Sequence, residues 1–260
     1  MAETVTQRDE AIPGVRFSPG GGWNLVLCNG MIRSASTWSY NAALRLLRAA
    51  VGSRCYGDYS ENTQTFLDAA PATADYLALK CHMLDGAARA LIDTRRAKVI
   101  YTCRELADAA ASFMRMFAYD FDHTCLALQG ALELYRLHRD SGTALILGYS
   151  GITSQPLRDI ARIAEYLEIA APEEVLGAIA EATSLERARA RVEALKAGAD
   201  ADQLVRFDRF VHDRETLLNL DHIRDGSTGY GRDLLTADQL ARIDALAAQY
   251  DFRPEGASLH

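Results

Sequence analysis

The segment 29–38 contains the residue types that bind a small anion. It combines one cation, Arg33, with three hydroxyl side chains, Ser34, Ser36 and Thr37. An arginine guanidinium presents a rigid fork of N–H donors that suits phosphate or sulfate, and the hydroxyl groups add further donors. The segment has no Gly-Lys pair, so it does not match the P-loop motif of nucleoside triphosphatases. It is also consistent with an ordinary strand-to-helix connection capped by Ser or Thr.

Other polar side chains follow apolar runs that have the length of buried strands. Lys80 and His82 follow one run, Arg104 follows a second and Tyr149 a third. In open α/β sheets, ligands bind beyond the carboxyl ends of the strands. We therefore expect these side chains to converge with Arg33 on a site for an anionic substrate, with His82 as its titratable base.

The elements that must position these residues alternate between strands and helices. Apolar runs predict strands at 24–28, 76–80, 98–102 and 144–147, with a short strand and turn at 54–59. Helices are expected from residue 37 onward and at 86–94, 106–119 and 124–139, and segment 62–70 is interpreted as a loop. After Tyr149 only helices are predicted, at 155–167, 172–182, 185–196 and 237–250. The alternation indicates an α/β fold with a central parallel sheet flanked by helices and a helical C-terminal half.

The composition is that of an ordinary globular protein, and it excludes several classes of partner. The 260 residues are 49% hydrophobic and 24% charged, and no clear linker divides them, which predicts a flexible N-terminal arm over 1–22 and one domain over 23–260. No apolar run approaches the ~20 residues of a membrane span, and the polar N-terminus does not look like a targeting signal, so a cytoplasmic location without a membrane partner is expected. The net charge of -7 argues against a nucleic-acid surface, and the five scattered cysteines predict reduced thiols without a metal site.

The polar positions resemble motifs of the sulfotransferase family. Segment 33–38 resembles its 5′-phosphosulfate loop, and Lys80-Cys81-His82 resembles its K-T-H signature. Residues 99–104, with Ser112 eight positions after Arg104, resemble its 3′-phosphate motif. The loop residues that the resemblance assigns to the donor are Arg33, Ser34, Ala35, Ser36, Thr37 and Trp38.

Later segments extend the resemblance across roughly residues 24–250. Segment 144–153 is similar to the strand that ends in a tyrosine near the nucleotide, here Tyr149, and segment 183–185 resembles a T-S-F segment beside the adenine. Segment 224–232 resembles an R-K-G-x-x-G-D-W-K loop that closes on the 3′-phosphate. The donor-binding residues added in this way are Arg104, Ser112, Tyr149, Thr183, Leu185, Arg224, Asp225 and Gly226. The sequence departs from the family pattern at Cys81, Leu185, Asp225, Tyr230 and Gly231, and Ala35 stands where that pattern has a glycine.

The resemblance implies a P-loop-like sulfotransferase fold and a specific reaction. A sulfuryl group would move from 3′-phosphoadenosine 5′-phosphosulfate (PAPS) to a hydroxyl or amine of a small-molecule or carbohydrate acceptor, leaving 3′-phosphoadenosine 5′-phosphate (PAP). His82 would be the general base, with Lys80 and Arg33 acting on the developing charge. Because segment 31–57 has no carboxylate, a base on the first helix is disfavoured, and the nearest carboxylates after it are Asp58 and Glu61.

Some assignments leave alternatives open. A small-molecule kinase and a non-catalytic nucleotide-binding protein on the same fold are the rival functions. Arg104 could instead pair with Glu105 or Asp108. An apolar acceptor wall is suggested by Tyr56, Tyr59, Phe66, Phe113 and Phe117, but the acceptor itself is not identified. The family's dimer signature is matched only at Arg232, Thr236 and Gln239, so both a monomer and a homodimer agree with the sequence.

Overall fold

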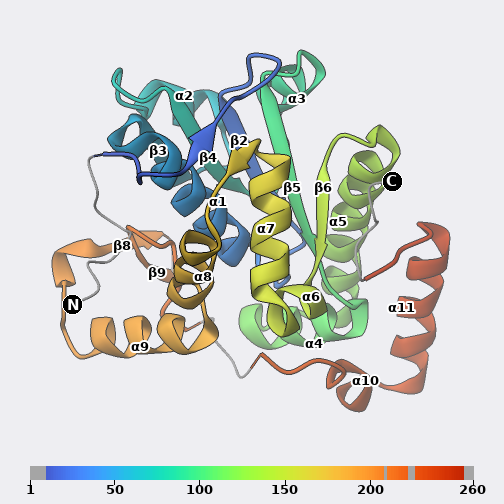
Figure 1. Ribbon diagram of the computed structural model, residues 1–260. Helices are drawn as coiled ribbons and strands as arrows, with labels where there is room; N and C mark the ends of the chain where they lie inside the picture. The colour runs from blue at the N-terminus through green and yellow to red at the C-terminus, as the bar shows by residue number, and fades with distance from the viewer. Residues whose placement is uncertain (1–9, 208–209, 222–225, 255–260) are drawn as a thin grey trace.

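The computed structural model describes residues 10–207, 210–221 and 226–254, and its centre is a five-stranded parallel sheet (Figure 1). The strand order is β3-β4-β2-β5-β6, and every neighbouring pair is parallel. The strands are β2 (Leu25–Gly30), β3 (Cys55–Tyr59), β4 (Tyr76–Cys81), β5 (Ala97–Cys103) and β6 (Leu145–Gly148). The predicted α/β class and all five predicted strands are confirmed.

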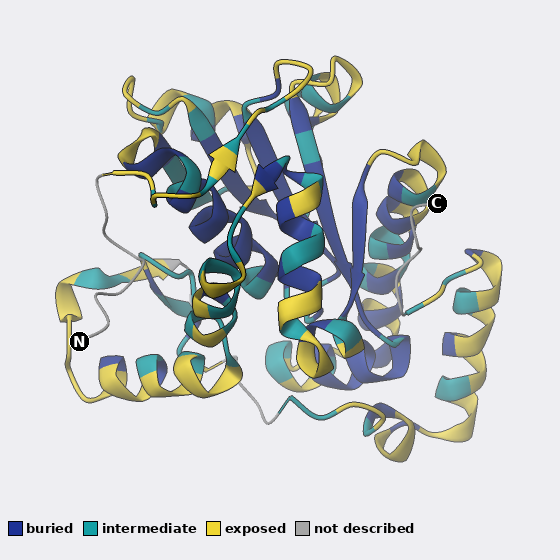
Figure 2. Ribbon diagram, viewed as in Figure 1, coloured by how far each residue is buried: buried dark blue, intermediate teal, exposed yellow. Residues whose placement is uncertain are grey.

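Helices cover both faces of the sheet because its strands bury side chains on both sides. Val26 and Cys28 of β2 pack with α1 (Ser36–Val51), α7 (Pro156–Tyr166) and α8 (Glu173–Ala182). Leu25 and Leu27 point to the opposite face, which is covered by α3 (Gly86–Asp93), α4 (Leu106–Phe117), α5 (Phe121–Ser141) and α11 (Ala237–Gln249). Figure 2 shows the strands as a buried layer between these helices. All five cysteines are buried and free.

Two predictions of secondary structure are wrong. Segment 62–70 is not a loop but contains α2 (Thr63–Ala69), because the Asn62 side chain accepts the N–H of Thr65 and Phe66 is buried. Strands also occur after Tyr149, namely β7 (Ile169–Ala170), β8 (Leu204–Phe207) and β9 (Phe210–Asp213). They are two to four residues long, too short for an alternating pattern to identify them.

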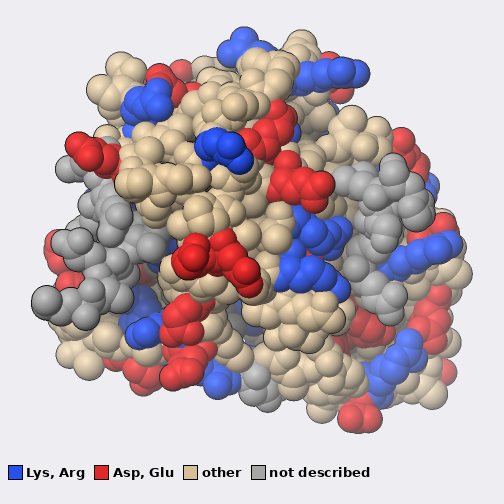
Figure 3. Space-filling model, in the orientation of Figure 1, with Lys and Arg blue, Asp and Glu red and all other residues tan. Residues whose placement is uncertain are grey.

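Smaller helices complete the C-terminal part of the chain. They are α6 (Tyr149–Ser154), α9 (Leu185–Lys196) and α10 (Gly231–Leu234). None of the described helices is long and apolar enough to cross a membrane. On the face drawn in Figure 3, acidic and basic side chains of the described residues are interspersed.

The segment that precedes β2 is fastened to the body of the protein. Its strand β1 (Arg16–Phe17) pairs antiparallel with β7. Glu168 accepts hydrogen bonds from the backbone N–H of Gly20 and from Trp23 Nε1 (3.3 Å), and its Oε1 lies 2.6 Å from Lys98 Nζ. One carboxylate therefore joins the N-terminal segment, the sheet and the turn after α7.

We predict that Glu168→Gln destabilises the protein in a pH-dependent way. Burial alone would raise the pKa of Glu168, but hydrogen bonds from Lys98 and Gly20 outweigh it and hold the pKa below its ordinary value of 4.5. The stabilisation is therefore complete above the unfolded-state pKa and is lost as pH falls through the folded-state pKa. Denaturant unfolding at neutral pH should show a loss of about 1–2 kcal/mol for the variant.

The same measurement well below pH 4.5 should show a smaller difference from the wild type. Glu165→Gln, an exposed position on α7, is the matched control and should leave the free energy of unfolding unchanged. An equal loss at both pH values would contradict the electrostatic explanation.

Candidate active site

The carboxyl ends of four neighbouring strands lie side by side, which brings the segments that follow them together. Gly30 of β2 pairs with Thr102 of β5, and Asn29 pairs with Cys81 of β4. Strand β6 runs parallel beside β5. The loop before α1, the end of β4, the start of α4 and Tyr149 therefore meet at one edge of the sheet, as predicted.

The loop between β2 and α1 is fixed by close packing against β5. A Cβ on Gly30 would lie 2.2 Å from Thr102 Oγ1, so only glycine fits there. The buried Ser34 hydroxyl lies 2.5 Å from the Met31 carbonyl oxygen and 2.7 Å from Thr102 Oγ1. The Ser34 hydroxyl is thus engaged within the fold and contributes to the site through the shape of the loop.

Backbone N–H donors at the start of helix α1 point out of its N-terminal end. Arg33 and Ala35 have left-handed backbones, with φ of 72° and 71°. Among the described residues, no acceptor takes the N–H groups of Ala35, Ser36 or Thr37. Unengaged N–H groups at the positive end of a helix dipole form an anion site.

Arg33 and Arg104 come together with Ser112, although they are far apart in the sequence. Arg33 Nε donates to Ser112 Oγ at 2.9 Å, and Arg104 Nη1 lies 3.5 Å from the Arg33 carbonyl oxygen. Burial, together with the nearby charge of Arg104, lowers the pKa of Arg33 to about 10. Two guanidinium groups and a buried hydroxyl therefore share the position that the sequence assigns to the 3′-phosphate.

Arg104 also makes the alternative contact considered from the sequence. Its Nη2 lies 3.3 Å from Asp108 Oδ2 and donates to the Ser227 carbonyl oxygen at 2.7 Å. The guanidinium carbon lies 4.0 Å from the centre of the Tyr149 ring. Arg104 Nε is buried and has no acceptor among the described residues, so one donor remains for a ligand.

Asp108 fastens the C-terminal loop to this site, a role that the sequence did not indicate. The fully buried carboxylate accepts the N–H of Gly229 at 2.8 Å and that of Gly231 at 2.7 Å. The Tyr230 hydroxyl donates to the Asp108 carbonyl oxygen at 3.2 Å. The segment 226–231 is therefore held against the first turn of α4, beside Arg104.

The departure at Gly231 has a structural reason. A Cβ there would lie 2.2 Å from the carbonyl carbon and oxygen of Ala107, so a tryptophan does not fit at this position. Gly226 lies against Leu185, with 3.0 Å between a Cβ built on the glycine and Leu185 Cδ2. Arg224 and Asp225 lie outside the described residues.

Lys80 and His82 form the pair predicted at the end of β4. Lys80 Nζ is 3.3 Å from His82 Nε2, and His82 Nδ1 is 2.9 Å from the Gly30 carbonyl oxygen. Because a carbonyl can only accept, Nδ1 carries the proton and the lone pair of Nε2 faces Lys80. Burial and the charge of Lys80 lower the pKa of His82 to about 3, so the imidazole is neutral at physiological pH.

Two further residues that the resemblance assigns to donor binding, Trp38 and Thr183, contact the core and the preceding helix. Trp38 is half-buried and packs against the core on the α1 face of the sheet. The Thr183 hydroxyl donates to the Ile179 carbonyl oxygen at 2.8 Å, inside its own helix. Within the described ranges, no three His, Cys, Asp or Glu side chains are grouped as metal ligands would be.

The predicted acceptor wall divides into two parts. Tyr56 stacks on Phe66 in the core, 5.6 Å between ring centres. Phe113 and Phe117 lie at the end of α4, and Phe117 meets Phe210 of the β8–β9 hairpin at 5.6 Å. Phe210 was not predicted as a site residue, because its strand β9 is only four residues long and was not recognised.

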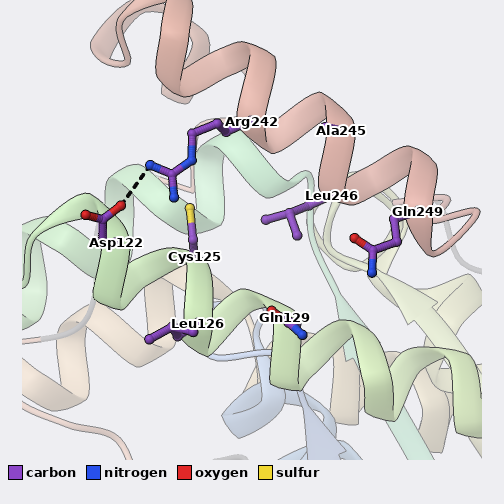
Figure 4. Close-up of a pocket in the computed structure, with 8 residues that line it drawn as sticks. All are labelled: Asp122, Cys125, Leu126, Gln129, Arg242, Ala245, Leu246 and Gln249. Carbon is purple, nitrogen blue, oxygen red and sulfur yellow. Dashed lines mark hydrogen bonds and ion pairs between the residues drawn. The ribbon is translucent and has the colours of Figure 1, made fainter.

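A separate cavity of about 510 Å³ lies between α5 and α11 (Figure 4). An ion pair of 2.8 Å between Arg242 and Asp122 borders it. None of the assigned site residues lines this cavity, which identifies it as distinct from the site at the sheet edge.

The parallel sheet places the loop before α1 and the Lys80–His82 pair together at the carboxyl ends of the strands, an arrangement suited to an anionic ligand. The chain belongs to the sulfotransferase family, because the family model described as "Sulfotransferase domain" matches residues 31–209. This assignment disfavours the kinase alternative.

Solved structures with the same fold are similar to this chain at low sequence identity. A mouse sulfotransferase complexed with PAP has a TM-score of 0.64 and 15% identity, with 90% of this chain and 86% of that chain covered. Retinol dehydratase with androsterone and the inactive cofactor PAP has a TM-score of 0.63 and 16% identity, with 90% and 83% covered. Retinol dehydratase with retinol and PAP has a TM-score of 0.62 and 15% identity, with 90% and 84% covered. A search of curated proteins found no match.

We predict that Gly231→Ala loosens the segment 226–234. The added Cβ would collide with backbone atoms of Ala107, and overpacking of this kind costs about 1–3 kcal/mol. Thermal unfolding should show a lower Tm, and hydrogen–deuterium exchange should rise in 226–234. Gly177→Ala, where a Cβ meets nothing within 4 Å, is the control and should change neither measurement adversely. Unchanged exchange in Gly231→Ala would show that this packing does not hold the loop.

Proposed function

We propose that this protein transfers a sulfuryl group from PAPS to a hydroxyl or amine of a small-molecule or carbohydrate acceptor and releases PAP. Membership of the sulfotransferase family supports the reaction class. The PAP-bound structures of similar fold support the donor. The observation that carries the proposal is the Lys80–His82 pair, 3.3 Å apart, beside the anion-binding loop.

The residues at the sheet edge fit a ligand with two anionic ends. Arg104 and Ser112, with the segment 226–231 beside them, would hold the 3′-phosphate. The N–H groups of residues 35–37 would hold the 5′-phosphosulfate. The Nε of Arg104 and the N–H groups of residues 35–37 have no acceptor among the described residues, and they are the donors that this fit requires.

His82 would accept the proton of the acceptor at Nε2. PAPS supplies an activated sulfuryl group, whose bond to the 5′-phosphate oxygen breaks as the bond to the acceptor oxygen or nitrogen forms. The hydrogen bond from Nδ1 to the Gly30 carbonyl oxygen fixes the tautomer with a free lone pair on Nε2. Arg33 and Lys80 would bind the negative charge that develops on the phosphate oxygen.

Lys80 must leave Nε2 before His82 can take a proton. The lysine contacts the same nitrogen that would act as the base, and its charge is one cause of the low pKa of His82. An anionic donor beside Lys80 would attract the ammonium group away from Nε2. That movement frees the lone pair and removes one of the effects that lower the pKa of His82, alongside burial and the charge of Arg33.

The side chains that would contact the acceptor favour an apolar alcohol as the acceptor substrate. The ring of Phe117 contacts the rings of Phe113 and Phe210 near the end of α4, which makes this region apolar. One structure of similar fold is complexed with androsterone and another with retinol, which are both apolar alcohols.

The direct test is turnover with PAPS and a panel of hydroxylated and amine acceptors, followed by mass spectrometry of the sulfated product. Turnover that depended on a nucleoside triphosphate and magnesium would instead indicate a kinase. Tight binding of PAP without turnover of any acceptor would indicate a non-catalytic nucleotide-binding protein.

We predict that Arg104→Ala weakens the binding of PAP far more than that of adenosine 5′-phosphosulfate, which has no 3′-phosphate. Loss of a charge-assisted hydrogen bond costs about 1.5–3 kcal/mol, or about 10–100-fold in Kd for PAP. Calorimetric titration of both nucleotides measures the difference. Arg104→Lys, which keeps the charge, should lose less affinity for PAP. Equal losses of affinity for the two nucleotides in Arg104→Ala would contradict the assignment of Arg104 to the 3′-phosphate.

We predict that His82→Asn lowers kcat about 10²–10⁴-fold, because a general base is removed, while PAP binds with a similar Kd. The loss should be smallest for acceptors of low pKa, which need less help to lose a proton. The low pKa of His82 keeps the free enzyme's imidazole neutral well below pH 6.5, so kcat/KM of the wild type should show no acid limb near that value. Near-normal turnover of His82→Asn on an alcohol of high pKa would assign the base to another residue.

A further inference from the structure

The carboxylate of Glu61 accepts hydrogen bonds from the backbone of the turn after β4. Glu61 Oε1 and Oε2 lie 3.0 Å and 3.1 Å from the backbone N of His82, and Oε2 lies 2.8 Å from that of Met83. The Tyr59 hydroxyl donates to Glu61 Oε1 at 2.9 Å. Three donors therefore converge on Glu61, and two of them belong to the turn that carries His82.

Tyr59 connects the same carboxylate to Lys80. Lys80 Nζ lies 5.0 Å from the centre of the Tyr59 ring, within the range of a cation–π interaction. The Tyr59 ring thus contacts the lysine while its hydroxyl holds Glu61. Burial lowers the pKa of Lys80 and the charge of Glu61 opposes that change, so the carboxylate also favours a charged lysine.

These contacts argue against Glu61 as the base itself. Both of its oxygens accept hydrogen bonds from groups that keep their protons during the reaction. Its contacts to this turn are to the backbone N–H groups of His82 and Met83, so it acts on the position of the turn.

We propose that Tyr59 and Glu61 are positioning residues. They hold the side chains of Lys80 and His82 in the positions that the transfer step requires. This inference rests on the proposed function, because it assigns Lys80 and His82 the roles given above. Both residues come from the end of β3 and the connection to α2, so the neighbouring strand of the sheet supplies the support for the catalytic pair.

The first part of the test is kinetic. Glu61→Ala should lower kcat about 10–100-fold, as expected when supporting hydrogen bonds of a site are lost, and should leave the Kd for PAP within about twofold. Glu61→Gln should fall between Glu61→Ala and the wild type, because an amide oxygen can still accept one of the N–H groups. The loss of kcat in Glu61→Ala should be larger for acceptors of high pKa, because their deprotonation depends most on a correctly placed His82.

The second part separates the two functions of Tyr59. Tyr59→Phe keeps the ring beside Lys80 and removes only the hydroxyl, so its loss in kcat should be a small part of that in Glu61→Ala. Tyr59→Leu removes the ring as well and should be more impaired than Tyr59→Phe. Tyr250→Phe is the matched control: like Tyr59, Tyr250 has a hydroxyl that donates to a glutamate, here Glu133 at 3.4 Å, and its removal should leave kcat unchanged.

Amide hydrogen exchange of His82 and Met83 gives a readout that does not depend on activity. Glu61→Ala should accelerate exchange at these two amides in the ligand-free protein, and Glu174→Gln, an exposed position on α8, should not. If the wild type shows no PAPS-dependent turnover, the proposed function fails, whereas accelerated exchange would still support the role of Glu61 in the turn.

Three results would overturn the inference. The first is a Glu61→Ala variant with unchanged exchange at His82 and Met83. The second is a loss of kcat, PAP affinity and Tm in parallel, which would identify a purely structural residue. The third is an equal and complete loss in Glu61→Gln and Glu61→Ala, matching His82→Asn, which would make Glu61 the base.

Discussion

Buried positive charge at the carboxyl edge of the sheet is the constraint on which the rest of the site depends. Lys80 and Arg104 are 7% and 6% exposed, and burial lowers the pKa of Arg33 to about 10. Burying a cation is costly unless it is paired and hydrogen-bonded. The fold offsets the cost only in part, through the Asp108 carboxylate and the faces of Tyr59 and Tyr149. An anionic ligand would supply the missing acceptors, which explains why several donors have none among the described residues.

The chain reaches this arrangement with residues that differ from the family pattern that it resembles. Ala35 adopts a left-handed backbone that costs roughly 1–2 kcal/mol without glycine, and the Ser34 bonds to Met31 and Thr102 hold the loop in that shape. At the other end of the chain, Gly231 lets the loop approach the α4 backbone, and the preceding Tyr230 makes the contact to Asp108. In both places the surrounding packing determines which residue is tolerated.

The sequence predicts this sheet and the positions of its ligand-facing residues because both follow from local patterns. Apolar runs identify the strands, and the carboxyl-end rule then selects Lys80, His82 and Arg104 without any knowledge of their contacts. Asp108, Glu61 and Phe210 could not be selected in this way, because their roles come from contacts with segments distant in the sequence. The helix α2 was missed for a different reason: its length of seven residues gives too little periodicity, and only the Asn62 cap marks its start.

Under the proposed function, Lys80 links donor binding to the strength of the base. In the ligand-free protein its ammonium group lies against His82 Nε2 and helps to lower the pKa of that imidazole to about 3. A group of such low pKa is a weak base, because proton transfer is most efficient when the pKa of the base lies near the operating pH. Once an anionic donor attracts Lys80, the lone pair is free and the repulsion from the lysine charge is gone. His82 would then be an effective base only when the group to be transferred is already in place, so that deprotonation of the acceptor is coupled to the presence of the donor.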